Sequence, residues 1–286
     1  MVVKKVQITV LMENSKNSAK PELQAKHGLS FFITATIDDD KKVTILTDVG
    51  PSPEALLHNA EVLGINLEDA DVVVLSHGHY DHTGGLICAL KQMKKQVPVV
   101  GHPMIFDPKL KIAPHLKHIG APFRQCDIEA AGGVPILSKS PVTVSEGIVT
   151  TGEVPRKTNF ESVKGFWTIS DKKFAEDKMT DDQSLVIDVE CKGLVVVSGC
   201  AHSGIINTIN YAKKITGNSR VYGVLGGFHL MAAANKKIEA TVDELKKLDI
   251  EFVGPSHCTG KKAIKKMKEE LGKCCRPIIT GDIIEL

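Results

Sequence analysis

Leu75-Ser76-His77-Gly78-His79-Tyr80-Asp81-His82-Thr83-Gly84-Gly85 holds four metal-binding side chains within six positions, directly after an apolar strand expected at residues 71–75. His77 and His79 are two residues apart in an extended turn, so they point the same way and can hold one ion. Asp81 and His82 lie on the turn into the next helix and can face a second ion. A surface loop that happens to be rich in histidine is the alternative, but it does not explain why a buried strand leads into H-x-H-x-D-H and Thr-Gly-Gly.

Apolar strands alternate with helices on both sides of this stretch. Strands are expected at residues 6–12, 31–37, 43–47, 71–75, 97–100, 147–151, 184–190, 194–197, 221–225, 252–254 and 277–279. Helices are expected at residues 53–63, 86–95, 205–215, 236–248 and 261–271. This order predicts one domain over residues 1–286, with two sheets packed together and helices outside them. Residues 107–133, which have little periodicity, are expected to form an insertion or lid.

Composition narrows the class of protein. The chain has 286 residues, 42% hydrophobic and 24% charged, and a formal net charge of +2. This balance excludes disordered and fibrous classes, and it gives no general attraction to nucleic acid or to a membrane. No signal peptide or membrane span is recognisable, and the seven cysteines are an odd count that does not predict a disulfide framework. We therefore expect a cytoplasmic protein with reduced thiols, and a homo-oligomer is left open.

Further candidate ligands follow other predicted strands. Asp48 closes the strand at residues 43–47, where a carboxylate often accepts from backbone N–H groups or from a ligand imidazole. An ordinary turn aspartate is the alternative. Cys200 and His202 follow the strand at residues 194–197 and could bind or bridge metal. Cys200 alone could equally be a small buried apolar side chain.

The other histidines divide by their position. His257, His102 and His229 follow strands, and for each of them metal or substrate contact and an ordinary loop position are equally good interpretations. Cys258, beside His257, is ambiguous in the same way. The remaining four are interpreted as surface or loop residues: His27, His58, His115 and His118.

The cluster at residues 77–82, with Asp48 before it and His257 near the end, resembles the metallo-β-lactamase superfamily over essentially the whole chain. The resemblance implies a four-layer αββα sandwich with a metal site at one edge of its two sheets. It implies that His77 and His79 bind one ion, and that the second is bound by Asp81, His82 and His257. Two divalent ions are expected, with zinc favoured and manganese, iron or magnesium as alternatives.

Two departures from the superfamily pattern concern the remaining ligands. The turn at residues 151–156 has no histidine where the superfamily usually has one. Gly199-Cys200 stands where a Gly-Asp usually supplies a carboxylate that bridges the metals. Either Cys200 or His202 could replace that ligand, and His202 is favoured because the usual metals of this fold accept imidazole readily.

The phrases at residues 151–156, 198–207, 226–230 and 255–260 together resemble one branch of the superfamily, that of archaeal pterin–aminobenzene ribotide synthases of methanopterin biosynthesis. This implies a small phosphorylated substrate and a transferase that releases diphosphate. A metal-dependent hydrolase of a phosphoester, thioester or lactone, using metal-bound hydroxide, is the alternative. A non-catalytic metal-binding module is a third.

Cations and helix starts near the expected site suggest how phosphate would be bound. Arg156 can bind phosphate bidentately and stabilise a leaving diphosphate, and Glu153 stands in the same turn. Ser203 opens a helix whose free N–H groups could hold phosphate. Lys261 is a further phosphate contact, although most of the lysines at residues 261–268 are expected on a solvated helix face. Two catalytic roles remain, orienting the nucleophile for Asp81 and acting as base for His229.

Overall fold

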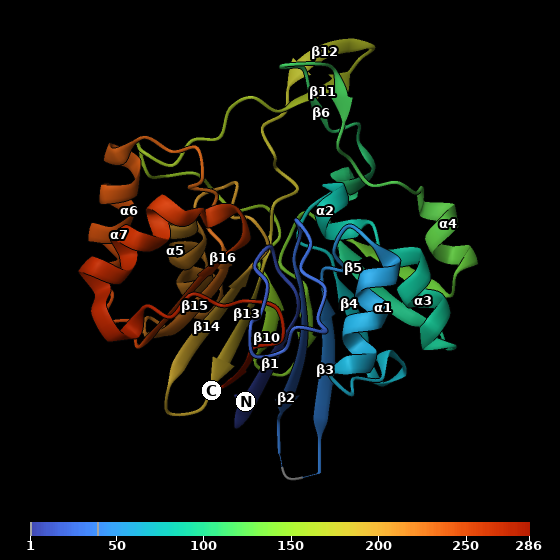
Figure 1. Ribbon diagram of the computed structural model, residues 1–286, viewed down its shortest axis with the longest axis horizontal. Helices are drawn as coiled ribbons and strands as arrows, with labels where there is room; N and C mark the ends of the chain where they lie inside the picture. Colours follow the sequence, from blue (N-terminus) through green and yellow to red (C-terminus); the bar gives the residue numbers. More distant parts are fainter. Residues whose placement is uncertain (1, 39) are drawn as a thin grey trace.

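Two β-sheets packed face to face form the centre of the computed structural model, which describes residues 2–38 and 40–286 (Figure 1). The first sheet has the strand order β17 (Ile283–Glu285), β1 (Lys5–Met12), β2 (Ser30–Thr36), β3 (Lys42–Thr47), β4 (Val72–Val74), β5 (Val97–Gly101), β8 (Gly133–Leu137). The second has the order β16 (Phe252–Ser256), β15 (Val221–Gly227), β14 (Gly193–Ser198), β13 (Ser184–Val189), β10 (Ile148–Thr150), β9 (Thr143–Ser145).

Helices cover the outer face of each sheet (Figure 1). Beside the first sheet lie α1 (Pro53–Val62), α2 (Tyr80–Thr83), α3 (Leu86–Met93) and α4 (Gln125–Ala130). Beside the second lie α5 (Ile205–Thr216), α6 (Asn235–Lys246) and α7 (Lys261–Leu271). Short 3-10 turns are η1 (Leu67–Asp69), η2 (Pro103–Phe106), η3 (His257–Thr259) and η4 (Gly272–Cys274). This arrangement confirms the predicted αββα sandwich.

Side-chain alternation along the strands explains the layers. In β4, Val72 and Val74 join the apolar cluster between the sheets, while Val73 packs in the cluster beneath the helices of the first sheet. In β14, Val195 and Val196 divide between the inter-sheet core and the helix side in the same way. Both faces of these strands are buried, which is why they appear in the sequence as continuous apolar runs.

A third, small sheet stands above the end of the sandwich near α2 (Figure 1). Its strand order is β12 (Lys173–Glu176), β11 (Trp167–Ser170), β6 (Leu110–Lys111), β7 (Lys117–His118). The segment 107–133 therefore supplies two of its strands and also α4, and the interpretation of that segment as a lid stays a prediction.

The expected strand at residues 277–279 is wrong. The last strand is β17, which pairs antiparallel with β1. Pro277 has no N–H to donate to a ladder. Ile278 instead places its side chain in the inter-sheet core, while its N–H donates to the carbonyl of Pro255 at 3.4 Å.

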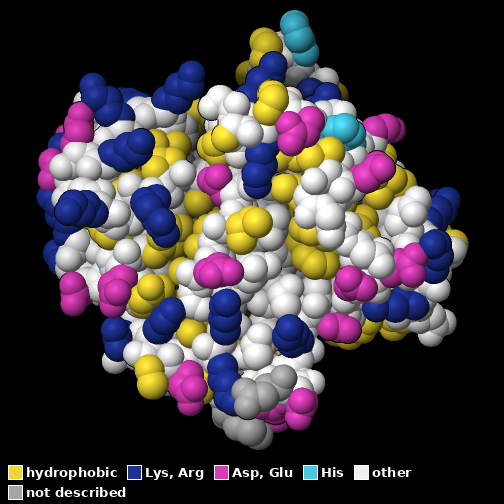
Figure 2. Space-filling view, turned by 60° about the horizontal axis from the view of Figure 1, so that its bottom comes forward, with side chains coloured by type: hydrophobic (Ala, Val, Ile, Leu, Met, Phe, Trp, Pro, Cys, Tyr) yellow, Lys and Arg dark blue, Asp and Glu magenta, His cyan; other side chains and the backbone are white. Residues whose placement is uncertain are grey.

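The surface carries charges of both signs, and the cysteines form no disulfide among the described residues. Lys and Arg side chains are interspersed with Asp and Glu over the face seen in Figure 2. All seven cysteines are free thiols. Among the described residues, no helix combines the length and apolar character needed to cross a bilayer.

Candidate metal centre

The carboxyl ends of β4, β14, β15 and β16 meet at one edge of the sandwich, and the stretch at residues 77–82 lies there. Glycine is needed at position 78 of this stretch, because a Cβ there would lie only 2.4 Å from the carbonyl oxygen of Ile105. The Gly78 N–H donates to Asp181 Oδ2 at 2.8 Å. His77 and His79 are thereby brought together, with 2.9 Å between His77 Nε2 and His79 Nδ1.

His202 joins these two residues, and we call His77, His79 and His202 the first donor group. One ring nitrogen of each lies within 4.8 Å of the others. His79 Nε2 and both ring nitrogens of His202 are buried without a hydrogen-bond partner among the described residues. Buried polar atoms normally have a partner, so these nitrogens fit the binding of a metal ion, and three imidazoles are a donor set typical of zinc.

A second donor group consists of Asp81, His82, Cys200 and His257. His82 Nε2 lies 3.2 Å from Cys200 Sγ and 3.2 Å from His257 Nε2. Asp81 Oδ2 lies 3.5 Å from His257 Nε2. The Cys200 thiol and one ring nitrogen each of His77 and His82 also lie within 4.8 Å of one another, so Cys200 stands between the two groups. Imidazole, thiolate and carboxylate donors at these distances fit a divalent metal ion.

Asp48 orients His82 through the ring nitrogen that does not face Cys200 and His257. Its Oδ2 lies 2.6 Å from His82 Nδ1, and it accepts from the Ser76 N–H and hydroxyl at 2.8 and 2.7 Å. Gly199 permits this approach, because a Cβ there would lie 2.0 Å from Ser76 Oγ. Asp48 therefore contacts an imidazole and a backbone N–H group, as its position at the strand end predicted, and the role of His82 as a metal ligand stays a prediction.

Backbone strain gathers at the same edge. Asp48, Ala201, His229 and His257 all have φ between +47° and +54°. This region is uncommon for residues other than glycine, and such strain concentrates at functional sites. The turns at the strand ends are therefore brought together at the expense of local backbone strain.

Protonation of the imidazoles suits metal binding in the first group. Burial lowers the pKa of His77, His79 and His202 well below the ordinary histidine value, and neighbouring imidazoles lower it further. The neutral imidazole is the form that binds metal. For His82, burial also opposes the charged form, but the Asp48 carboxylate raises the pKa to about 9. Metal binding at His82 Nε2 therefore requires the release of a proton.

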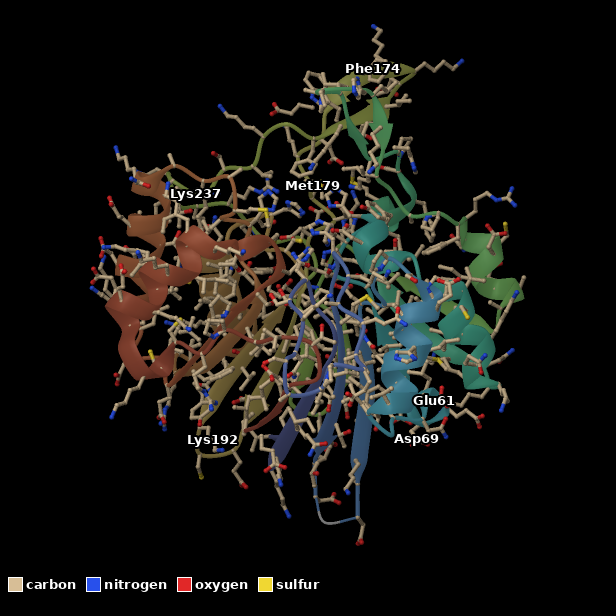
Figure 3. All side chains as sticks on the ribbon, in the orientation of Figure 1. Glu61, Asp69, Phe174, Met179, Lys192 and Lys237 are labelled. Atoms are coloured by element: carbon tan, nitrogen blue, oxygen red, sulfur yellow. The ribbon has the colours of Figure 1, made fainter. Side chains whose placement is uncertain are left out.

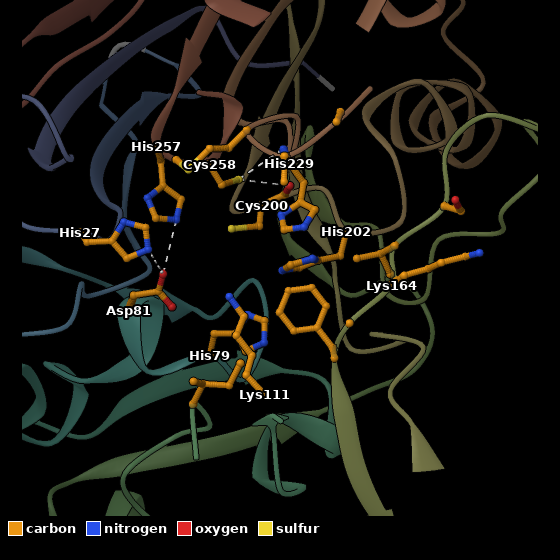
Figure 4. Close-up of a pocket in the computed structure, with 18 of the residues that line it drawn as sticks. His27, His79, Asp81, Lys111, Lys164, Cys200, His202, His229, His257 and Cys258 are labelled. Carbon is orange, nitrogen blue, oxygen red and sulfur yellow. Dashed lines mark hydrogen bonds and ion pairs between the residues drawn. The ribbon is translucent and has the colours of Figure 1, made fainter. Parts of the chain in front are cut away.

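Both donor groups open into a cavity of about 540 Å³ (Figure 4). Its wall includes His79, Asp81, Cys200, His202, His229 and His257. Phe166, which is buried, packs 5.0 Å from His79 and 5.1 Å from His202 between ring centroids. Four lysines line the same cavity: Lys111, Lys117, Lys164 and Lys237.

Several residues predicted for phosphate binding lie outside this cavity lining. The Arg156 guanidinium donates to the backbone carbonyls of Lys178 and Met179. Glu153 Oε1 lies 3.0 Å from Nε2 of the buried His102. Lys261 is exposed at the start of α7.

Carboxylates already occupy the helix start that was expected to bind phosphate. The Ser203 N–H donates to Asp182 Oδ2 at 2.9 Å. Glu161 accepts from the N–H groups of Ile206 and Asn207, both at 2.8 Å. The N-terminus of α5 is therefore satisfied by the protein itself, and an anion there would meet two negative side chains.

Sequence reasoning missed two sets of cavity residues. His27, interpreted as a loop residue, is exposed, but its Nε2 lies 3.3 Å from Asp81 Oδ2. Asn14 connects it to the centre, since it lies 3.3 Å from His27 Nδ1 and 2.8 Å from His257 Nδ1. The four cavity lysines were also missed. No local motif marks any of these residues, because they come from loops, strands and a helix far apart in the sequence.

Residues 19–157 match the β-lactamase superfamily domain. The chain belongs to the metallo-β-lactamase superfamily, as its fold and strand-edge donor groups indicate. It is 36% identical to the 7,8-dihydropterin-6-methyl-4-(β-D-ribofuranosyl)-aminobenzene-5′-phosphate synthase of Methanocaldococcus jannaschii, over 99% of this chain and 97% of that one.

Two further proteins are similar over most of the chain. An uncharacterized protein of the same archaeon is 33% identical over 88% of this chain and 91% of its own length. The crystal structure of Tm1679, described as a metal-dependent hydrolase of the β-lactamase superfamily, has a TM-score of 0.82 and 26% identity, covering 98% of this chain and 99% of that one. These similarities support the prediction that the chain is an enzyme.

Proposed function

We propose that this chain is a metal-dependent transferase that joins a dihydropterin methyl diphosphate to a ribofuranosyl-aminobenzene phosphate and releases diphosphate. The observation that carries the proposal is the 36% identity, over 99% of the chain, to a synthase named for that product. A cavity of about 540 Å³ beside the donor groups supports it, because ligand sites of enzymes fall in the range of roughly 300–1,000 Å³.

We further propose that the two donor groups hold two divalent ions. The first group would hold one ion and the second group would hold the other, with Cys200 standing between the two groups. The thiol and imidazoles favour zinc or iron over magnesium. Such ions supply positive charge that neutralises a leaving diphosphate.

The side chains around the cavity account for the remaining needs of the transfer. The amine nitrogen forms a bond to the pterin methylene carbon, the C–O bond breaks, and diphosphate leaves with the bonding electrons. The amine must lose one proton, and His229 Nδ1 would accept it, because this atom is buried on the cavity wall without a hydrogen-bond partner among the described residues. Phe166 offers an apolar wall for an aromatic substrate. Arg156, Glu153, Ser203 and Lys261 have no part in this proposal because they lie outside the cavity lining.

A metal-dependent hydrolase is the second candidate function. The similarity to Tm1679, over nearly the full length of both chains, favours it. The same donor groups would serve either reaction, so substrate tests must separate the two.

The deciding experiment incubates zinc-, iron- or manganese-loaded protein with the pterin diphosphate, with and without the aminobenzene ribotide. We expect diphosphate release to require both substrates and to match formation of the joined product. The His229→Gln variant should lose turnover while keeping its metal. A parallel panel of phosphodiesters, thioesters and lactones tests hydrolysis. Turnover confined to those esters would reject the transferase.

A further inference from the structure

Four lysines around the cavity stand in two pairs on different sides of it. Lys111 on β6 and Lys117 on β7 belong to the small sheet. Lys164 follows Glu161 in the loop before β11, and Lys237 lies on α6 (Figure 3). Figure 4 shows Lys111 beside His79 and Lys164 beyond His202. The mouth of the cavity is therefore positively charged on two sides.

These lysines are available to an anionic ligand. In the described part of the chain none of the four forms an ion pair with a carboxylate, and Asp81 is the only acidic side chain in the cavity lining. Some lysines elsewhere on the surface are paired, as Lys246 and Lys266 are with Glu270. Unpaired cations gathered around one cavity favour binding of phosphate groups.

Aromatic and backbone contacts position three of the four lysines. Lys111 Nζ lies 5.3 Å from the Phe166 ring centroid, and Lys117 Nζ lies 5.5 Å from that of Tyr80. On the other side, Lys237 Nζ donates to the Ser162 carbonyl at 2.9 Å, two residues before Lys164. Lys111 thus belongs to the small sheet beside His79, whereas Lys164 lies beyond His202 in Figure 4.

We propose that the cavity has two distinct phosphate subsites: Lys111 and Lys117 bind a diphosphate beside the metal centre, and Lys164 and Lys237 bind the phosphate monoester of the second substrate. This assignment rests on the proposed transferase function. The diphosphate is assigned to the first pair because Lys111 lies next to His79, where a leaving group would meet the metal ions. A hydrolase of one phosphorylated substrate would need only one such subsite.

Binding measurements on the metal-loaded protein test the subsites without requiring turnover. The probes are inorganic diphosphate and the aminobenzene ribotide, each titrated by calorimetry. Loss of one charged hydrogen bond weakens binding by about tenfold or more. We expect Lys111→Met to weaken diphosphate by that factor and to leave the ribotide within about twofold, and Lys164→Met to do the reverse.

Matched controls separate a local contact from a general loss of charge. The controls are Lys173→Met and Lys236→Met. Lys173 lies on the same small sheet, Lys236 lies beside Lys237, and neither residue lines the cavity. Both controls should bind the two probes as the parent does. The two subsites would be overturned if either cavity variant weakened binding of the two probes equally. They would also be overturned if neither variant weakened binding of any probe. If binding separates as expected but no joined product forms, the proposed reaction fails while the subsites stand.

Discussion

Replacement of Lys109 by methionine should destabilise the protein, because two buried carboxylates would lose their ion-pair partner. Lys109 is 1% exposed, and its Nζ lies 2.7 Å from Asp181 Oδ1 and 3.0 Å from Asp177 Oδ2, both also buried. Burial alone would lower the pKa of the Lys109 ammonium, but the two carboxylates raise it above its ordinary value. Lys109→Met keeps most of the side-chain volume and removes the charge that compensates both aspartates.

The size of the effect follows from the burial of all three groups. Removing one partner of a buried ion pair costs about 3–5 kcal/mol. At about 2.1 cal/mol/K per residue, the unfolding entropy of 286 residues is about 0.6 kcal/mol/K. The melting temperature should therefore fall by about 5–8 °C. Circular dichroism of thermal unfolding measures this, with the exposed Lys173→Met as the control, for which a change within about 0.5 kcal/mol is expected.

The triple variant Lys109→Met, Asp177→Asn, Asp181→Asn tests the cause. It removes the stranded charges, and it should recover a large part of the lost stability. Because Asp181 also accepts from the Gly78 N–H, hydrogen exchange at Gly78 should be faster in Lys109→Met than in the parent. A fall of less than about 2 °C for Lys109→Met, or no recovery in the triple variant, would refute the reasoning.

Three further predictions concern the metal centre and its support. Asp48→Asn should weaken metal binding by about 10–100-fold, measured by competition with a chelator, because His82 loses the carboxylate that orients it; unchanged affinity would contradict this. His202→Ala should lower the bound metal per chain in elemental analysis while the fold is retained, whereas His58→Ala should leave the metal content unchanged. Glu161→Gln should cost about 1–3 kcal/mol, because its carboxylate accepts two backbone N–H groups of α5; urea unfolding that matches the parent would exclude that role.

Much of the fold was predictable because burial on both faces leaves a continuous apolar run. The triplet at Val72–Val74 is one such run, and the polar cluster after it had to lie at the sheet edge. The start of α1 at residue 53 was predicted too, and the Ser52 hydroxyl caps it by accepting from the Ala55 N–H. Residues 277–279 misled because an apolar triplet after a proline can bury itself in the core without joining a ladder.

The cations of the cavity were less predictable because the partners of a cation are set by tertiary contacts. Arg156 has the right charge and lies after the right strand, but the carbonyls of Lys178 and Met179 hold it. Lys111 and Lys164 have no motif, and only the approach of the small sheet to the 162–166 loop brings them to one cavity. Local sequence thus indicates which residues carry a suitable charge, and the packing of distant segments determines which of them line the cavity.

The donor groups show how strand order can preserve a metal site while its sequence changes. The superfamily's usual turn histidine would follow β10, and here that turn has none. In the second sheet β13 lies between β10 and β14, and both β10 and β14 are antiparallel to it, so their carboxyl ends lie at the same edge. A histidine after β14 can therefore reach the space that one after β10 would fill. His202 does so, since its ring lies 4.8 Å from His77 and 5.1 Å from His79 between centroids. Cys200, two residues earlier, stands between the two donor groups.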